Sequence, residues 1–94
     1  MHDSLFRALA DPTRRRILEL LADKDRTAGE IAEQFPIAFA SVSHHLGILK
    51  AAGLVAAERE GQFIRYRLNT TVFQEIARYF MARFPGGGGG GNDA

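Results

Sequence analysis

The sequence contains no cysteine at any of its 94 positions. A chain without thiols has no disulfide framework, no thiolate zinc site, no cysteine nucleophile and no thiol-based redox sensor. It also has no apolar run that approaches the ~18–20 residues of a membrane span, and its Met-His-Asp start lacks the basic and apolar regions of a signal peptide. We therefore expect a cytoplasmic protein with no membrane span.

The length of 94 residues leaves room for one small domain, because single domains usually run from roughly 50 to 200 residues. A domain of this size buries only about 60–65% of the surface of its unfolded chain, so a partner subunit often adds to its stability. Six consecutive glycines begin at Gly86, and such a run loses too much backbone entropy to hold one conformation. We expect a folded domain over residues 1–85 and a flexible tail over residues 86–94.

Acidic residues are absent between Gln34 and Ala57, although the whole chain is nearly balanced, with 12 Lys and Arg against 11 Asp and Glu. Basic residues form one cluster at residues 14–16 and a second that comprises Lys50, Arg59, Arg65 and Arg67. Each cluster alone could be an ordinary solvated face. A long stretch without acids instead favours a polyanionic partner.

Apolar spacing predicts helices over residues 5–10, 12–22, 28–35, 38–52 and 70–84, with a polar loop at residues 23–26. Local signals mark their ends: Asp11 before a proline, Thr27 with Glu30 as a capping box, Gly53 as a C-terminal cap and Asn69 as an N-terminal cap. Alternation over residues 55–59 and 63–68 around a glycine turn predicts a hairpin. The predicted fold is mostly α with a small antiparallel β-hairpin, a winged helix-turn-helix.

The fourth predicted helix has a small, polar outer face. If Val42 points to the core, a step of about 100° per residue turns a set of small, hydroxyl and imidazole side chains outward or to the flanks. A helix enters the major groove, which is about 12 Å wide, only if its outer face lets the backbone approach while polar groups reach the base edges. The candidate DNA-binding residues on this helix are Ala40, Ser41, Ser43, His44, Gly47 and Lys50.

His45 is expected to border the core rather than enter a groove, because it lies about 60° from the centre of the apolar stripe. Adjacent residues on a helix diverge by about 100°, so His44 and His45 cannot easily chelate one ion. They also do not form a hydrolase site, since no carboxylate is placed to orient the imidazole. We expect neither a metal site nor enzymatic activity.

The predicted hairpin supplies a second candidate contact with DNA, through Arg59, Arg65 and the tip residue Gln62. Basic residues also keep an edge hairpin soluble, but here the hairpin and the helix carry the same sign of charge. Thr27 and Arg14 are further candidate phosphate contacts. At most one arginine of residues 14–16 is expected to touch phosphate.

These residues resemble the ArsR-type winged helix-turn-helix repressors of bacteria. The resemblance rests on residues 9–18 (LADPTRRRIL), 41–55 (SVSHHLGILKAAGLV) and 59–62 (REGQ). Within the family, residues 62–64 and 68–71 are most similar to the SdpR-type autorepressors. The resemblance implies a homodimer on an inverted-repeat operator, joined through the first and last helices. The implied interface residues are Leu5, Phe6, Leu9, Phe73, Ile76, Phe80 and Phe84.

The chain departs from the resembled family in two places. Many relatives sense metals through a cysteine motif on the third helix and His and Asp ligands on the last helix, whereas this chain has only Glu33 in the first place and Gln74, Glu75 and Arg78 in the second. Residues 38–40 (AFA) also replace the usual Ser cap and polar residue at the start of the recognition helix. We expect no metal control and no cofactor, with weakened operator affinity or a larger share carried by the wing.

The predicted function is a sequence-specific, possibly autoregulatory DNA-binding repressor, in which a protein that sequesters the dimer could provide control. One alternative is a protein-interaction module, which exposed apolar residues such as Ile48 and Phe63 would favour. Another is non-specific DNA packaging, which would show equal affinity for operator and scrambled DNA.

Overall fold

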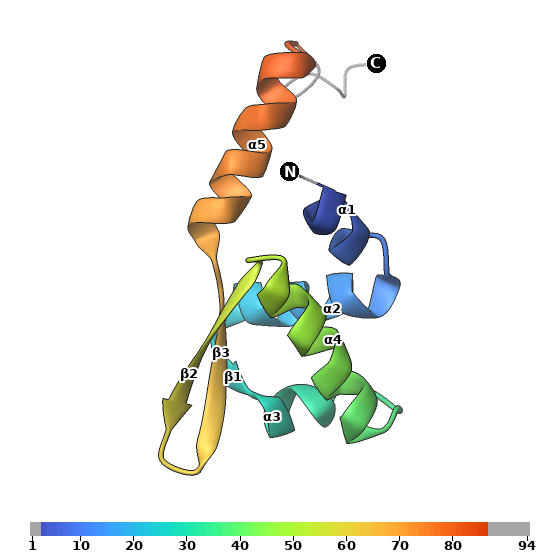
Figure 1. Cartoon of the computed structure of the whole chain (residues 1–94), viewed down its shortest axis with the longest axis vertical. Coiled ribbons are helices and arrows are strands. Elements are labelled where there is room, and N and C mark those ends of the chain that lie inside the picture. Colours follow the sequence, from blue (N-terminus) through green and yellow to red (C-terminus); the bar gives the residue numbers. More distant parts are fainter. Residues whose placement is uncertain (1–2, 87–94) are drawn as a thin grey trace.

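The computed structural model describes residues 3–86 of the chain (Figure 1). Apart from Gly86, the predicted glycine tail lies outside the described residues. The elements, in chain order, are α1 (Asp3–Leu9), α2 (Pro12–Asp23), β1 (Arg26–Thr27), α3 (Ala28–Ala32), α4 (Phe39–Ala51), β2 (Val55–Glu60), β3 (Phe63–Leu68) and α5 (Thr70–Arg83). This order confirms the predicted winged helix-turn-helix.

The predicted caps begin and end the helices. The Asp11 side chain accepts a hydrogen bond of 3.0 Å from the Arg14 backbone N–H at the start of α2. Thr27 and Glu30 form the reciprocal capping box of α3. Asn69 caps α5 by accepting from the Val72 N–H, and its amide donates to the Gly53 carbonyl at 2.9 Å. Gly53 has φ +80°, the left-handed conformation expected after α4.

The sheet contains one strand more than predicted. Strands β2 and β3 form the expected hairpin, pairing from Val55 with Leu68 to Glu60 with Phe63. Residues 26–27 pair with β3 as well, which gives the antiparallel order β1-β3-β2. The prediction of a loop was therefore wrong at Arg26. A strand of two residues is too short to show alternation, and only its pairing with β3 creates it.

Helix α3 is shorter than predicted, because it ends at Ala32 and a turn follows over residues 33–37. Proline disfavours helical backbone in the residue before it, so Pro36 limits the helix from the C-terminal side. Phe35 nevertheless packs against the core, as its apolar spacing indicated. Helix α4 begins at Phe39, since Ala38 is an extended N-cap residue without a side-chain hydrogen bond.

The core lies where α2, α3 and α4 meet the sheet. Its largest fully buried side chains are Ile17, Ile31, Val42, Leu46, Leu49 and Leu54. Helix α5 contributes no buried residue and extends away from this core at the opposite end of the molecule from the hairpin tip (Figure 1). The described residues include no helix that is long and apolar enough to cross a bilayer.

Candidate nucleic-acid interface

Helix α4 separates a buried face from an exposed face as predicted. Val42, Leu46 and Leu49 are buried, while the six candidate residues on the other side are all exposed. A Cβ atom added at Gly47 would meet no atom within 4 Å. Packing within the chain therefore does not require a glycine at this position, and the outer surface of α4 is open to a large partner.

His45 anchors the buried edge of α4. Its side chain is 18% exposed, and Nδ1 lies 3.2 Å from Nη1 of Arg14 and 3.9 Å from Oδ2 of Asp11. A guanidinium group only donates hydrogen bonds, so this contact needs Nδ1 as an acceptor and places the imidazole proton on Nε2. The expectation that His45 borders the core is confirmed.

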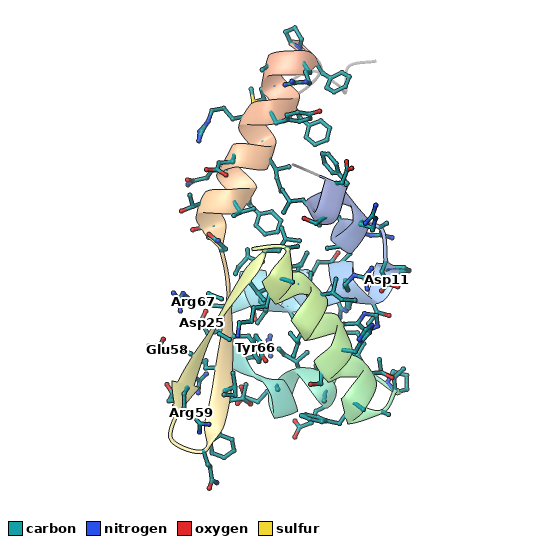
Figure 2. All side chains as sticks on the ribbon, in the orientation of Figure 1. Asp11, Asp25, Glu58, Arg59, Tyr66 and Arg67 are labelled. Atoms are coloured by element: carbon teal, nitrogen blue, oxygen red, sulfur yellow. The ribbon has the colours of Figure 1, made fainter. Side chains whose placement is uncertain are left out.

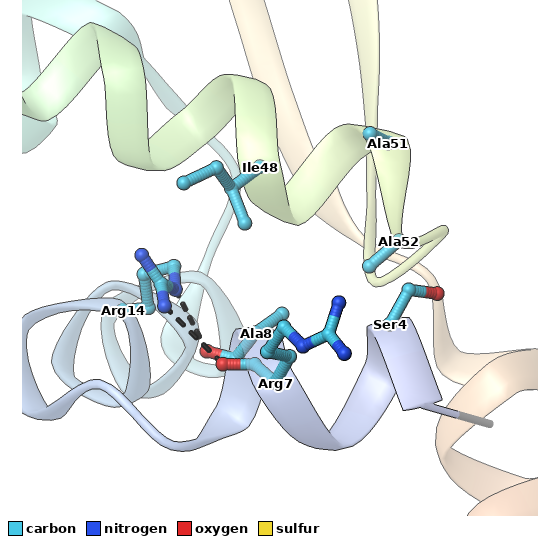
Figure 3. Close-up of a pocket in the computed structure, with 7 residues that line it drawn as sticks. All are labelled: Ser4, Arg7, Ala8, Arg14, Ile48, Ala51 and Ala52. Atoms are coloured by element: carbon cyan, nitrogen blue, oxygen red, sulfur yellow. Dashed lines mark hydrogen bonds between the residues drawn. The ribbon is translucent and has the colours of Figure 1, made fainter.

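The arginines of residues 14–16 have internal partners that the sequence did not reveal. Arg14 donates from Nε to the Ala8 carbonyl at 2.8 Å and from Nη2 to the Arg7 carbonyl at 3.2 Å (Figure 3). Arg15 donates to the Leu9 carbonyl at 2.8 Å, and Arg16 pairs with Glu19 on the surface. Arg14 and Arg15 thus bind the last carbonyls of α1. The phosphate contact of Arg14 stays a prediction.

A mostly apolar hollow of about 320 Å³ separates α1 from the C-terminal half of α4 (Figure 3). Ile48 and Ala51 of α4 and the C-cap residue Ala52 lie across it from residues of α1, and Arg14 lies at its edge. Arg14 therefore ties α1 to α2 beside this hollow and, through His45, contacts α4.

The wing is the hairpin of β2 and β3, and its arginines differ in their partners. Arg65 donates to Glu60 at 2.8 Å, and this hydrogen bond and the Glu60 charge raise the pKa of Arg65. Arg67 pairs with Glu58 at 3.6 Å. Within residues 3–86, Arg59 has no acidic partner at ion-pair distance and donates only to the Gly61 carbonyl. Figure 2 labels Arg59, Glu58 and Arg67 along the hairpin.

The ion pairs of the wing were missed, although the hairpin register offered a signal. Strand pairing places Glu58 opposite Arg65 and Glu60 opposite Phe63. Each acid pairs with the arginine two positions farther along β3, which is the diagonal neighbour within reach of a long side chain. Of the two arginines predicted to contact DNA from the wing, Arg59 is the one free of acids and Arg65 is partly neutralised by Glu60. Gln62 is exposed at the tip, as predicted.

Thr27 connects α3 to the wing. Its hydroxyl accepts from the Glu30 N–H at 3.2 Å, and its own N–H donates to the Glu30 carboxylate at 2.8 Å. The second of these hydrogen bonds lowers the pKa of Glu30. Because Thr27 also pairs with Arg65 in the sheet, the first turn of α3 lies beside the hairpin.

A hollow of about 470 Å³ lies between α3, α4 and the wing. It brings together Thr27, Ser43 and Gln62, which the sequence placed on three different elements. Phe39 and Phe63 line the same hollow and are 56% and 55% exposed. From the sequence, Phe39 was considered only as one of residues 38–40, which replace the usual N-terminal cap of the recognition helix.

No metal centre is apparent between residues 3 and 86, where no three His, Asp or Glu side chains lie close enough to hold one ion.

The family model described as bacterial regulatory protein, arsR family, matches residues 11–57, which span α2 to the start of the wing. The transcriptional repressor SdpR of Bacillus subtilis is 52% identical over 79 residues, which cover 84% of this chain and 88% of that protein. The chain belongs to the ArsR family. As a member, it is a DNA-binding transcriptional repressor and not an enzyme.

Solved structures of this ArsR-family repressor's relatives share its fold. An ArsR-like transcriptional regulator from Rhodococcus sp. RHA1 is 35% identical, with a TM-score of 0.77 over 84% of this chain and 74% of that one. Another ArsR family transcriptional regulator is 27% identical, with a TM-score of 0.81 over 86% of this chain and 89% of that one. These similarities favour the repressor over the protein-interaction module considered from sequence alone.

Proposed function

We propose that the chain acts as a homodimer on an inverted-repeat operator, with α4 in the major groove and the wing against the adjacent backbone. The observation that carries this proposal is the exposed outer face of α4, beside which Thr27, Ser43 and Gln62 surround one hollow. In this arrangement Ser43 and His44 contact base edges, and Arg59 contacts phosphate or the minor groove. Repression follows from blocking polymerase at the promoter, in the cytoplasm where bacterial DNA lies.

The open apolar surface of α1 and α5 supports dimerisation through these helices. Phe6, Phe80 and Phe84 are 37%, 44% and 59% exposed. Their rings already gather into one cluster, with centroids 6.2 Å apart for Phe6 and Phe80 and 5.9 Å apart for Phe80 and Phe84. A second copy would cover this surface, and two-fold symmetry would set the half-sites about 34–36 Å apart.

We also propose that the repressor regulates its own gene and is controlled without a metal ion. The resemblance of residues 62–64 and 68–71 to SdpR-type autorepressors implies autoregulation, and the chain is 52% identical to the SdpR transcriptional repressor over 79 residues. Control would come from the concentration of the dimer or from a protein that sequesters it. Titration of zinc, copper and nickel against the complex with DNA should leave it intact, and release at micromolar metal would contradict this proposal.

A double variant, Ser43→Ala with His44→Ala, tests whether the outer face of α4 is the reading face, the surface that contacts base edges. Gln74→Ala, on the exposed side of α5, is the control. The double variant should lose about 1–3 kcal/mol of discrimination for each base contact removed, while its affinity for scrambled DNA stays unchanged. The control should bind as the parent does. If the double variant kept its preference for the operator, the outer face of α4 would not be the reading face.

A further inference from the structure

The large exposed apolar side chains form two groups at opposite ends of the molecule. One group lies on α1 and α5, where the proposed second copy would cover it. The other comprises Ile37, Phe39 and Phe63. It lies where α4 begins and the hairpin turns, at the end away from α5 (Figure 1). Phe39 and Phe63 line one hollow with Ser43, so the second group borders the proposed DNA interface.

Helix α4 lacks the side chains that most often distinguish bases. Residues 39–51 contain no Arg, Asn, Gln, Asp or Glu, and the single Lys50 lies in the last turn. Bidentate contacts from Arg to guanine, or from Asn or Gln to adenine, are therefore impossible from this helix. Apart from Lys50 in the last turn, its means of recognition are hydroxyl and imidazole groups and apolar surface.

The apolar surface lies at the N-terminal end of the recognition helix. In helix-turn-helix proteins, the N-terminal residues of the recognition helix contact the base edges. Here those residues are Phe39, Ala40 and Ser41, all exposed. Ala38 forms no side-chain cap, so no polar side chain stands in front of Phe39 at this helix end. The first two residues of α4 thus present an aromatic ring and a methyl group, next to the Ser41 hydroxyl.

We propose that Phe39, with Ala40 beside it, determines operator specificity by packing against thymine 5-methyl groups in each half-site. Thymine is the base that offers an apolar group in the major groove, and Ala and Phe are suited to contact it. This inference rests on the proposed function. It explains why a residue with 56% of its surface exposed is a phenylalanine at the first position of α4.

Replacement of thymine by deoxyuridine tests this directly, because it removes the methyl group and leaves the charge and hydrogen-bonding groups of the duplex unchanged. The purified protein is first used to select a tightly bound duplex from a random-sequence pool. The selected duplex and its deoxyuridine form are then compared by fluorescence anisotropy at one salt concentration. Loss of one buried methyl group should weaken binding about fourfold. Loss of one in each of the two half-sites should therefore weaken binding to the deoxyuridine duplex about fifteenfold. Equal affinity for the two duplexes would overturn the inference.

Two variants assign the effect to one residue. Phe39→Ala should weaken binding to the thymine duplex and lose most of the deoxyuridine effect, since the two changes remove the same contact. The control is Gln74→Ala, exposed on α5 away from the proposed DNA interface, which should keep the full deoxyuridine effect. Thermal unfolding verifies that both variants fold. Retention of the full effect by Phe39→Ala would overturn the inference, whereas failure to select any duplex over scrambled DNA would overturn the proposed function as well.

Discussion

Arg14 of α2 and His45 of α4 are joined by a contact of 3.2 Å between Nη1 and Nδ1. The same guanidinium binds two carbonyls near the end of α1. One side chain therefore connects the first helix, which we assign to the dimer interface, with the recognition helix. In the proposed dimer, this side chain would link the interface helix α1 to the recognition helix α4.

Replacement of Arg14 by Ala should cost about 1–3 kcal/mol of stability, because it leaves the part-buried Ala8 carbonyl without its side-chain donor. Arg16→Ala is the matched control, since it removes only an exposed ion pair with Glu19, and it should change stability by less than about 0.5 kcal/mol. Urea unfolding measures both. Equal stability of the two variants would show that the Arg14 contacts contribute nothing. The same variant tests the predicted phosphate contact of Arg14. If that contact exists, Arg14→Ala should reduce the slope of log affinity for DNA against log salt concentration by about 1.

Asp11 should make the stability of the protein depend on pH. The hydrogen bond from the Arg14 backbone lowers the pKa of Asp11 in the folded state below its ordinary value. A carboxylate with a lowered pKa stabilises the fold at neutral pH, and this stabilisation is lost as the pH falls through the folded-state pKa. Asp11→Ala should thus cost about 1 kcal/mol near neutral pH, and the difference from the parent should shrink in acid.

Urea unfolding at several pH values between about 2 and 7 measures this difference. The exposed Gln74 provides a control that does not titrate, and Gln74→Ala should follow the parent at every pH. A cost of Asp11→Ala that stayed constant into strong acid would show that the cap does not act through its charge.

Charge placed within the aromatic cluster of α1 and α5 should separate the dimer. Phe80→Glu is expected to raise the dimer dissociation constant by at least about thirtyfold, the effect of losing a central interface residue worth roughly 2 kcal/mol. The control is Phe63→Glu on the wing, which should stay dimeric. Analytical ultracentrifugation reports the association state of each. An undiminished dimer in Phe80→Glu would locate the interface elsewhere.

The arginines of the wing should contribute unequally to DNA binding. Arg59 has no acidic partner within the described part of the chain, whereas Arg67 is paired with Glu58. Arg59→Ala should weaken binding to all duplexes alike and lower the salt slope by about 1, as expected for one lost phosphate contact. Arg67→Ala should have a smaller effect. Anisotropy titrations at several salt concentrations measure the slopes, and equal slopes for parent and Arg59→Ala would remove this residue from the interface.

The features that the sequence predicted depend on neighbours along the chain. The capping box at Thr27, the Asn69 cap and the left-handed Gly53 follow from local backbone chemistry. The two faces of α4 follow from helical periodicity, so every candidate residue there was found on the exposed side.

The features that the sequence did not predict depend on contacts between distant segments. Strand β1 exists because Arg26 and Thr27 meet Tyr66 and Arg65 across the sheet. The sequence predicted at most one phosphate contact from residues 14–16 and did not identify the acceptors of the other arginines, whereas Arg14 and Arg15 bind carbonyls of α1. A long, flexible arginine side chain gives no indication in sequence of which acceptor it will reach.

The most direct measurement is fluorescence anisotropy of the purified protein on a duplex from upstream of its own gene, beside a scrambled duplex, at about 150 mM salt. A sequence-specific autorepressor should prefer the native duplex by ~10³-fold or more. Equal weak binding to both duplexes would contradict specific recognition of that operator by α4 and the wing.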